Sequence, residues 1–181
     1  MRAGPYFWSL WVLAVAAAAG GCANYQLGTQ GRLAFATLYV APVQNRTLLP
    51  QAQEVVTTQL RSALANDGRV RLVNSPDGAD ASLSVVIVDY HREVAAVREQ
   101  DTGLAGEFSE TLGVLCTLTD NRARRPFFEN RPVHTQRDVY VDNGNPHSSL
   151  VGDQLQAEYN SVPLLAESIA GRIAHAVLDV W

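Results

Sequence analysis

The sequence lacks lysine altogether and has only two cysteines, Cys22 and Cys116. All fourteen basic residues are arginines, and eighteen acidic residues leave a formal net charge of −4. A mildly acidic chain has no global attraction for phosphate backbones, so we expect no nucleic-acid partner. The hydrophobic content of 47% is typical of a folded globule and not of a disordered chain.

Motifs of catalysis and cofactor binding are also missing. The sequence contains no glycine-rich phosphate loop and no G-x-S-x-G nucleophile turn. The carboxyl groups of Glu107 and Glu110 could lie close together in the folded protein, but the sequence does not show whether they do. We therefore predict a protein that is not an enzyme and needs no cofactor or metal, although a deep pocket with converging polar groups would reopen the question. The four histidines lack metal-ligand spacing: His91, His134, His147 and His175.

The first residues have the three parts of a secretory signal. Arg2 supplies a positive start, residues 7–19 are apolar, and Gly20 and Gly21 precede Cys22. The apolar run is too short for a transmembrane helix, which needs about 20 residues. The segment resembles the lipobox of bacterial lipoproteins, which implies that residues 1–21 are a signal peptide and that Cys22 carries diacylglycerol and a further acyl chain such as palmitate.

Lipid attachment at Cys22 has an alternative and several consequences. Ala19 stands where the lipobox usually has leucine, so an ordinary secretory signal that leaves Cys22 as a free thiol stays open. If Cys22 is lipidated, two or more acyl chains hold the protein stably on a membrane, and Cys116 has no disulfide partner. Glycines in residues 22–32 predict a flexible tether, and residues 33–181 have the length of a single domain.

The hydrophobic pattern predicts an α+β fold, with two helices packed on one face of a mostly antiparallel four-stranded sheet. The first helix is expected to begin with Thr47 or a neighbour as its cap, and Gly68 should terminate it in the left-handed conformation. Pro163 leaves the start of the last helix undecided, because the proline either begins that helix or kinks a longer one that begins near Asp153. We expect the strands at residues 33–43, 69–73, 81–99, 107–119 and 127–141, with the first half of 81–99 buried on both faces.

Four arginines gather in the sequence around one predicted turn and the strand after it. Guanidinium groups form paired hydrogen bonds with phosphate and carboxylate oxygens, so this cluster is a candidate contact for an anionic lipid headgroup or for an acidic surface of a partner. The alternative is a solvated hairpin tip with no binding role. The cluster consists of Arg122, Arg124, Arg125 and Arg131.

The mature chain resembles the LptE family of lipopolysaccharide-assembly lipoproteins over nearly its whole length. The stretches that carry the resemblance are Tyr25-Gln26-Leu27-Gly28 after Cys22, Val40-Ala41-Pro42-Val43-Gln44-Asn45-Arg46-Thr47, Arg69-Val70-Arg71-Leu72-Val73, Ala79-Asp80-Ala81, Pro163-Leu164-Leu165-Ala166-Glu167-Ser168-Ile169-Ala170 and the last residue, Trp181. No single stretch is diagnostic, since other bacterial lipoproteins share the strand, Asn-Arg-Thr turn and helix.

The resemblance implies two helices on a four-stranded sheet and a role without catalysis. Members of the family act as plug and assembly partner of the LptD β-barrel in the outer membrane, and some bind lipopolysaccharide. Ala23 is not the aspartate that favours inner-membrane retention, so we expect an outer-membrane protein on the periplasmic side. An envelope lipoprotein that activates a peptidoglycan synthase, similar to the activators of penicillin-binding proteins, remains the alternative.

Overall fold

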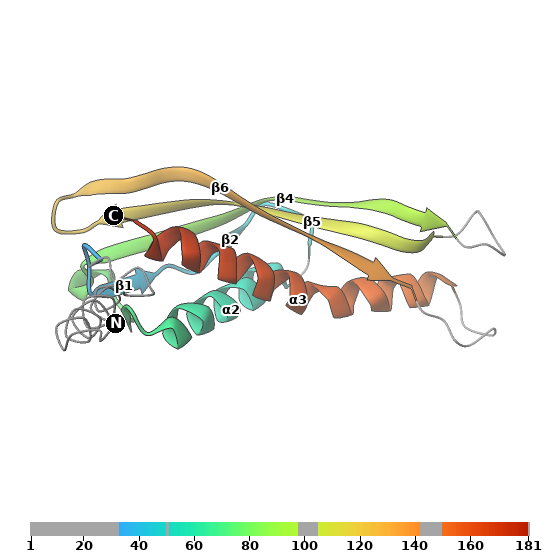
Figure 1. Ribbon diagram of the computed structural model, residues 1–181, viewed down its shortest axis with the longest axis horizontal. Helices are drawn as coiled ribbons and strands as arrows, with labels where there is room; N and C mark the ends of the chain where they lie inside the picture. Colours follow the sequence, from blue (N-terminus) through green and yellow to red (C-terminus); the bar gives the residue numbers. More distant parts are fainter. Residues whose placement is uncertain (1–32, 50, 98–104, 142–149, 181) are drawn as a thin grey trace, which may run out of the picture. The chain divides into compact units, whose positions relative to one another are not determined.

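The computed structural model describes residues 33–49, 51–97, 105–141 and 150–180, which lie in one compact unit that begins at Leu33 (Figure 1). The predicted signal peptide, Cys22 and the tether lie outside the described residues. In chain order, the elements are β1 (Thr37–Val40), β2 (Gln44–Asn45), α2 (Ala52–Asp67), β3 (Arg71–Val73), a short 3-10 helix (Pro76–Gly78), β4 (Ala81–Val97), β5 (Ala105–Asp120), β6 (Arg125–Tyr140) and α3 (Leu150–Leu178).

The predicted α+β class with two helices is confirmed, but the sheet differs in detail. The described strands form one six-stranded sheet in the order β3-β1-β4-β5-β6, with β2 beside β4. The pairs β4–β5 and β5–β6 are antiparallel, whereas β1 and β2 run parallel to β4 and β3 runs parallel to β1. The sheet therefore has six strands where four were expected, and short parallel pairings accompany the two long antiparallel ones. Strand β3 is parallel to β1 because α2 carries the chain back along the sheet before β3 begins.

The first predicted strand, 33–43, is shorter in the structure, where β1 spans Thr37–Val40 and a second short strand, β2, begins just after the predicted end at Gln44. Pro42 lies between the two and has no N–H, so it cannot continue a ladder on its donor side. Both strands still pair with β4: Val40 lies opposite Leu83, and Gln44 lies opposite Val86. The break thus accounts for one of the two strands beyond the expected four.

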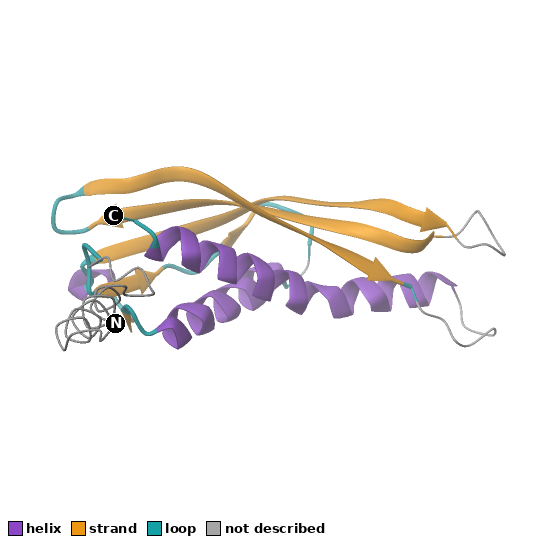
Figure 2. Cartoon of the chain, in the orientation of Figure 1, coloured by secondary structure: helices purple, strands orange, loops and turns teal. Residues whose placement is uncertain are grey.

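Both helices lie on the same side of the sheet (Figure 2). In β4, Leu83, Val85 and Ile87 face the helices and are fully buried, while Ser84 and Val88 on the opposite face are exposed. The expectation that the first half of this strand is buried on both faces is wrong, because no helix among the described residues covers the second face. That open face carries mostly polar side chains.

Helix α2 follows its predicted pattern at one end and departs from it at the other. Gly68 ends the helix with φ 75°, the left-handed conformation that glycine adopts without strain. Thr47 does not cap the helix. Its N–H and hydroxyl donate to Asn45 Oδ1 at 2.9 and 2.8 Å, which closes a local turn, and Gln51 occupies the capping position without a side-chain hydrogen bond.

Helix α3 settles the alternatives at Pro163, because it runs through the proline from Leu150 to Leu178. Proline removes one hydrogen bond from a helix interior. Pro163 lies on the exposed side of α3, where solvent can reach the carbonyl that loses its partner. The buried side supplies much of the core, with Leu165, Ala166, Ile169, Ala170, Ile173 and Val177.

Strand β6 is the long edge of the sheet, a position that tolerates Pro132, which has no N–H to donate to a neighbouring strand. Its first half contains Pro126 and Pro132. The pairing with β5 also shifts register between Cys116 and Leu118, next to Asn130 with φ 47°. Its second half pairs with β5 without interruption. The first half of this edge is therefore protected against pairing with a further strand, and the second half lacks that protection.

Candidate functional site

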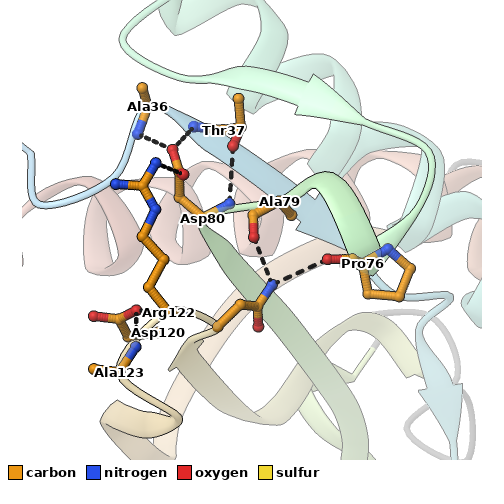
Figure 3. A network of polar contacts seen from close by, with 9 residues as sticks. Ala36, Thr37, Pro76, Ala79, Asp80, Asp120, Arg122 and Ala123 are labelled. Atoms are coloured by element: carbon orange, nitrogen blue, oxygen red, sulfur yellow. Dashed lines mark hydrogen bonds and ion pairs between the residues drawn. The ribbon is translucent and has the colours of Figure 1, made fainter.

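Arg122, the first of the four predicted contact arginines, is bound to a carboxylate of the same domain (Figure 3). Its guanidinium forms an ion pair with Asp80 Oδ1. Asp80 Oδ2 accepts hydrogen bonds from the backbone N–H groups of Ala36 and Thr37, both at 3.0 Å. These backbone bonds, with a smaller contribution from Arg122, hold the pKa of Asp80 below its usual value. Arg122 therefore helps to join the start of β4 to β1.

The turn that carries Arg122 is itself fixed by side chains. Asp120 Oδ1 accepts from the N–H groups of Arg122 and Ala123 at 2.8 and 2.9 Å. The Asn121 amide donates to the carbonyl of Ala79 at 3.0 Å and to Ser82 Oγ at 2.9 Å. The β5–β6 turn is thus tied to the chain just before β4 and presents its remaining side chains from a defined position.

Arg131 lies apart from the turn and contacts the last turns of α3. Its guanidinium lies 4.0 Å from the ring centroid of Phe128, in cation–π geometry, and donates to the carbonyl of Ala176 at 3.1 Å. The two other arginines, Arg124 and Arg125, are exposed and have no side-chain partner among the described residues. The predicted cluster therefore separates into two arginines used within the fold and two that are free to meet an anion.

A buried polar network was not predicted from the sequence. Glu110 on β5 is fully buried and accepts hydrogen bonds from the hydroxyls of Ser161 on α3 and Tyr90 on β4, the latter at 3.3 Å. Tyr90 also donates to Glu158 at 2.8 Å, and Arg92 forms an ion pair with Glu158 at 2.8 Å. Burial raises the pKa of Glu110 above its usual value. The network joins α3 to the sheet.

The alternation of residues along β5 was the signal that could have located this carboxylate. Glu110 shares the parity of Phe108 and Leu112, which both face the helices. Glu107 has the opposite parity and lies opposite Tyr140 of β6. The two carboxylates that the sequence left undecided therefore have different surroundings and different partners.

Two grooves lie along α3. The first, of about 420 Å³, separates α3 from the end of β6 and is lined by Arg137, Asp138, Val139, Tyr140, Gln156, Ala157, Asn160, Ser161 and Leu164. The second, of about 390 Å³, lies between α3 and the start of α2 and is more apolar, with Leu49, Val55, Leu155, Tyr159, Val162 and Pro163 among its lining residues. Both are surface grooves between secondary-structure elements.

Other kinds of site find no support in the described residues. None of their His, Cys, Asp and Glu side chains gather in a group that could hold a metal ion. No described helix has the length and hydropathy required to span a bilayer. Cys116 is a buried free thiol whose pKa is raised by burial to about 12, so it is not a reactive nucleophile at neutral pH.

The chain is similar to several solved structures at low sequence identity. The chain is 13% identical to uncharacterized lipoprotein B from Nitrosomonas europaea, with a TM-score of 0.52 and coverage of 86% of this chain and 93% of that one. A hypothetical protein from Chlamydia trachomatis gives the same identity and TM-score, with 80% and 97% coverage. A minor lipoprotein from Acinetobacter baumannii is 17% identical, with a TM-score of 0.49 and coverage of 80% and 92%.

The sequence itself matches a family pattern. None of the curated proteins is similar enough to match the chain. The pattern described as LptE, lipopolysaccharide-assembly, matches residues 35–176, which extend from just before β1 into the last turns of α3. Because the match includes every described strand and most of α3, the chain belongs to the LptE family of lipopolysaccharide-assembly proteins.

Proposed function

We propose that the protein is a non-catalytic outer-membrane lipoprotein that assists lipopolysaccharide assembly as plug and assembly partner of an LptD-like β-barrel. The observation that carries the proposal is the family match over residues 35–176. Lipid attachment at Cys22 would place the domain on the periplasmic side of the membrane that contains the barrel. The folded domain then needs no membrane-spanning segment of its own.

The open face of the sheet supports the role of a plug. On β4 it carries exposed Ser84, His91 and Glu93, and on β6 it carries exposed His134 and Gln136. The lumen of an outer-membrane barrel is lined with polar side chains. A polar sheet face without a helix over it can lie against such a wall through hydrogen bonds and water without burying a large apolar area.

Recovery of the barrel from detergent-solubilised outer membranes tests this function. The tagged wild-type protein should co-purify with an LptD-like barrel, whereas recovery of a peptidoglycan synthase instead would favour the alternative role. Ser84→Trp places a bulky side chain on the open face and should lower barrel recovery. Thr58→Trp is a matched control, because Thr58 is exposed on α2, away from that face. Equal recovery with both variants would contradict contact through the open face.

The anchor is tested separately. Replacing Cys22 with Ser removes the thiol that would accept the lipid, so the protein should move from the membrane fraction to the soluble periplasmic fraction. Fractionation after a high-salt wash measures this change. Protein that stays with the membrane would show that another contact, and not a lipid on Cys22, holds it there.

The exposed arginines of the β5–β6 turn are the proposed contact for lipopolysaccharide phosphates. Arg124→Glu together with Arg125→Glu should weaken binding of purified lipopolysaccharide without loss of stability, since neither side chain has a partner among the described residues. Arg46→Glu with Arg71→Glu is the control, because it makes the same change in net charge at other exposed positions. Equal weakening by both pairs would indicate general charge repulsion. Arg122 is left unchanged because it pairs with Asp80.

A further inference from the structure

The second half of the β6 edge has features of a site for strand addition. A free sheet edge presents backbone N–H and C=O groups that another strand can pair with, and prolines or bulges normally prevent this. Arg125–Pro132 contains both kinds of protection, namely Pro126, Pro132 and the register shift beside Asn130. Val133–Tyr140 contains neither and pairs regularly with β5.

The outer side of Val133–Tyr140 is not used within the domain. In the part of the chain that the structure describes, no backbone hydrogen bond joins this segment to any strand other than β5. Two of its side chains bond to neighbouring elements of the same domain. Thr135 shares a hydrogen bond with Ser168 of α3 at 2.7 Å, and Gln136 donates to Ser109 of β5 at 2.7 Å. The first of these contacts holds α3 beside the edge, and Val139 packs against Ala157 of the same helix, so α3 covers one face of this segment.

The groove of about 420 Å³ lies beside this edge. Four consecutive residues of β6, Arg137–Tyr140, line it. Consecutive residues of a strand point to opposite faces, so a groove that touches all four must run along the edge and not over one face. Its other wall is α3, with Gln156, Asn160 and Leu164. A sheet edge opposite a helix is the geometry in which an extended peptide adds as a further strand.

We propose that Val133–Tyr140 pairs with an extended segment of the barrel partner, which lies in the groove between β6 and α3. The inference rests on the proposed function, because that function supplies the partner. In a closed barrel the wall strands are hydrogen-bonded on both sides. The added strand must therefore come from a loop or terminal segment of the barrel protein. Arg137 and Asp138 give the edge both signs of charge, which suits a largely uncharged segment.

Hydrogen exchange of the purified complex and of the free protein tests the pairing. Every second backbone amide in Val133–Tyr140 should exchange about tenfold or more slowly in the complex, because only alternate amides point away from β5. The amides of Phe127–Arg131, on the protected half of the same edge, should exchange at the same rate in both. If the amides that point away from β5 exchange at the same rate in the free protein and in a complex that does contain the barrel, the pairing alone is overturned.

A variant that fills the groove gives a second readout. Asn160 is exposed and lines the groove, so Asn160→Trp should obstruct the added strand and lower barrel recovery about tenfold at limiting concentration, while the urea midpoint stays unchanged. Glu167→Trp is the matched control, since Glu167 is exposed on α3 and does not line the groove.

The outcomes separate the pairing from the function it rests on. Barrel recovery unaffected by Asn160→Trp overturns the pairing and leaves the proposed function standing. Failure of the wild-type protein to recover any barrel overturns both. In the free protein, the same amides could instead exchange more slowly as the protein concentration is raised. That result would show that a second copy of this chain occupies the edge, and it would also overturn the pairing with a barrel segment.

Discussion

Asp80 and Glu110 are two poorly exposed carboxylates in one sheet, and their surroundings act on them in opposite directions. Asp80 accepts two hydrogen bonds from backbone N–H groups and pairs with Arg122, and its pKa lies below the usual value of 3.8. Glu110 meets the hydroxyls of Ser161 and Tyr90, and burial keeps its pKa above the usual value of 4.5. At Asp80 the backbone donors outweigh the effect of burial on the pKa, whereas at Glu110 burial outweighs the hydroxyl donors.

Counting hydrogens explains why the hydroxyls are weak partners for a charged Glu110. Each hydroxyl has one hydrogen, yet Ser161 Oγ also lies 2.7 Å from the carbonyl of Glu158, and the Tyr90 hydroxyl lies 2.8 Å from the Glu158 carboxylate. Two hydrogens cannot satisfy four contacts. A proton on Glu110 would supply a third hydrogen, and it would let Ser161 donate its own hydrogen to the carbonyl of Glu158. Backbone N–H groups at Asp80 face no such competition.

The largest effect is expected from Asp80→Ala. The change removes the acceptor for Ala36 and Thr37 and leaves Arg122 unpaired, so we expect a loss of about 2 to 3 kcal/mol in the free energy of unfolding. Urea unfolding at neutral pH measures it. Asp77→Ala is the control, since Asp77 is exposed in the neighbouring turn. A similar small effect for both variants would contradict a structural role for Asp80.

Acid should abolish this contribution. The folded pKa of Asp80 is depressed, so its stabilising contribution is present above the unfolded value of about 3.9 and is lost as pH falls through the folded pKa. The stability difference between the wild-type protein and Asp80→Asn should therefore narrow in acid. A difference that does not change with pH would mean that the charge of Asp80 does not contribute.

Ser161→Ala should have the next largest effect. It removes a hydroxyl that bonds the buried Glu110, and the expected cost is about 1 to 2 kcal/mol because one oxygen loses its partner away from solvent. Ser168→Ala provides a comparison on the same helix, at a hydroxyl that contacts Thr135 instead. If Ser161→Ala costs the same in the Glu110→Gln background as in the wild type, the two residues are not coupled.

Glu110→Gln should change the pH dependence more than the stability itself. The pKa of Glu110 is higher in the folded protein than in the unfolded chain. Below the unfolded pKa of about 4.3 the carboxyl group is neutral in both states, so its charge does not affect stability. The free energy of unfolding then falls as pH rises from there to the folded pKa. The variant should remove this fall and be at least as stable as the wild type at neutral pH. Unfolding measured between acid and neutral pH checks it, and a marked loss of stability at neutral pH would contradict the interpretation.

The smallest effect is expected from Arg124→Ala or Arg125→Ala. Both side chains are exposed without a partner among the described residues, so stability should change by less than about 0.5 kcal/mol. Arg122→Ala should cost more, because it releases Asp80. Equal effects from all three substitutions, measured by urea unfolding, would remove the distinction between structural and free arginines in this turn.

Local patterns made much of the fold predictable. Gly68 marked the end of α2, and the alternation of β5 placed Cys116 and Leu118 in the core. Ser75-Pro76-Asp77-Gly78 has the composition of a turn, and Ser75 starts that turn before β4 by accepting a hydrogen bond from the Asp77 N–H. Each of these features depends on residues close together in the chain, where backbone geometry and side-chain periodicity act directly.

The candidate site was less predictable. The sequence placed four arginines together, but whether each one is free depends on partners far along the chain: Asp80 for Arg122 and the carbonyl of Ala176 for Arg131. Pro163 was compatible with two helix lengths, and the longer one has contacts before the proline, where Glu158 and Ser161 bond to Tyr90 and Glu110 of the sheet. The groove beside β6 has no sequence pattern, since it depends on how α3 packs beside the strand.

The sequence by itself determined the α+β class, the helix and strand periods and the family, because these depend on local spacing and on the order of residues. It also contains the candidate lipid site at Cys22. Only the tertiary structure decided that β1, β2 and β3 add parallel strands, that Asp80 and Glu110 have opposite pKa shifts, and that half of β6 remains an open edge. Strand pairing and the partners of each carboxylate depend on residues brought together from distant parts of the chain, and no local pattern specifies them.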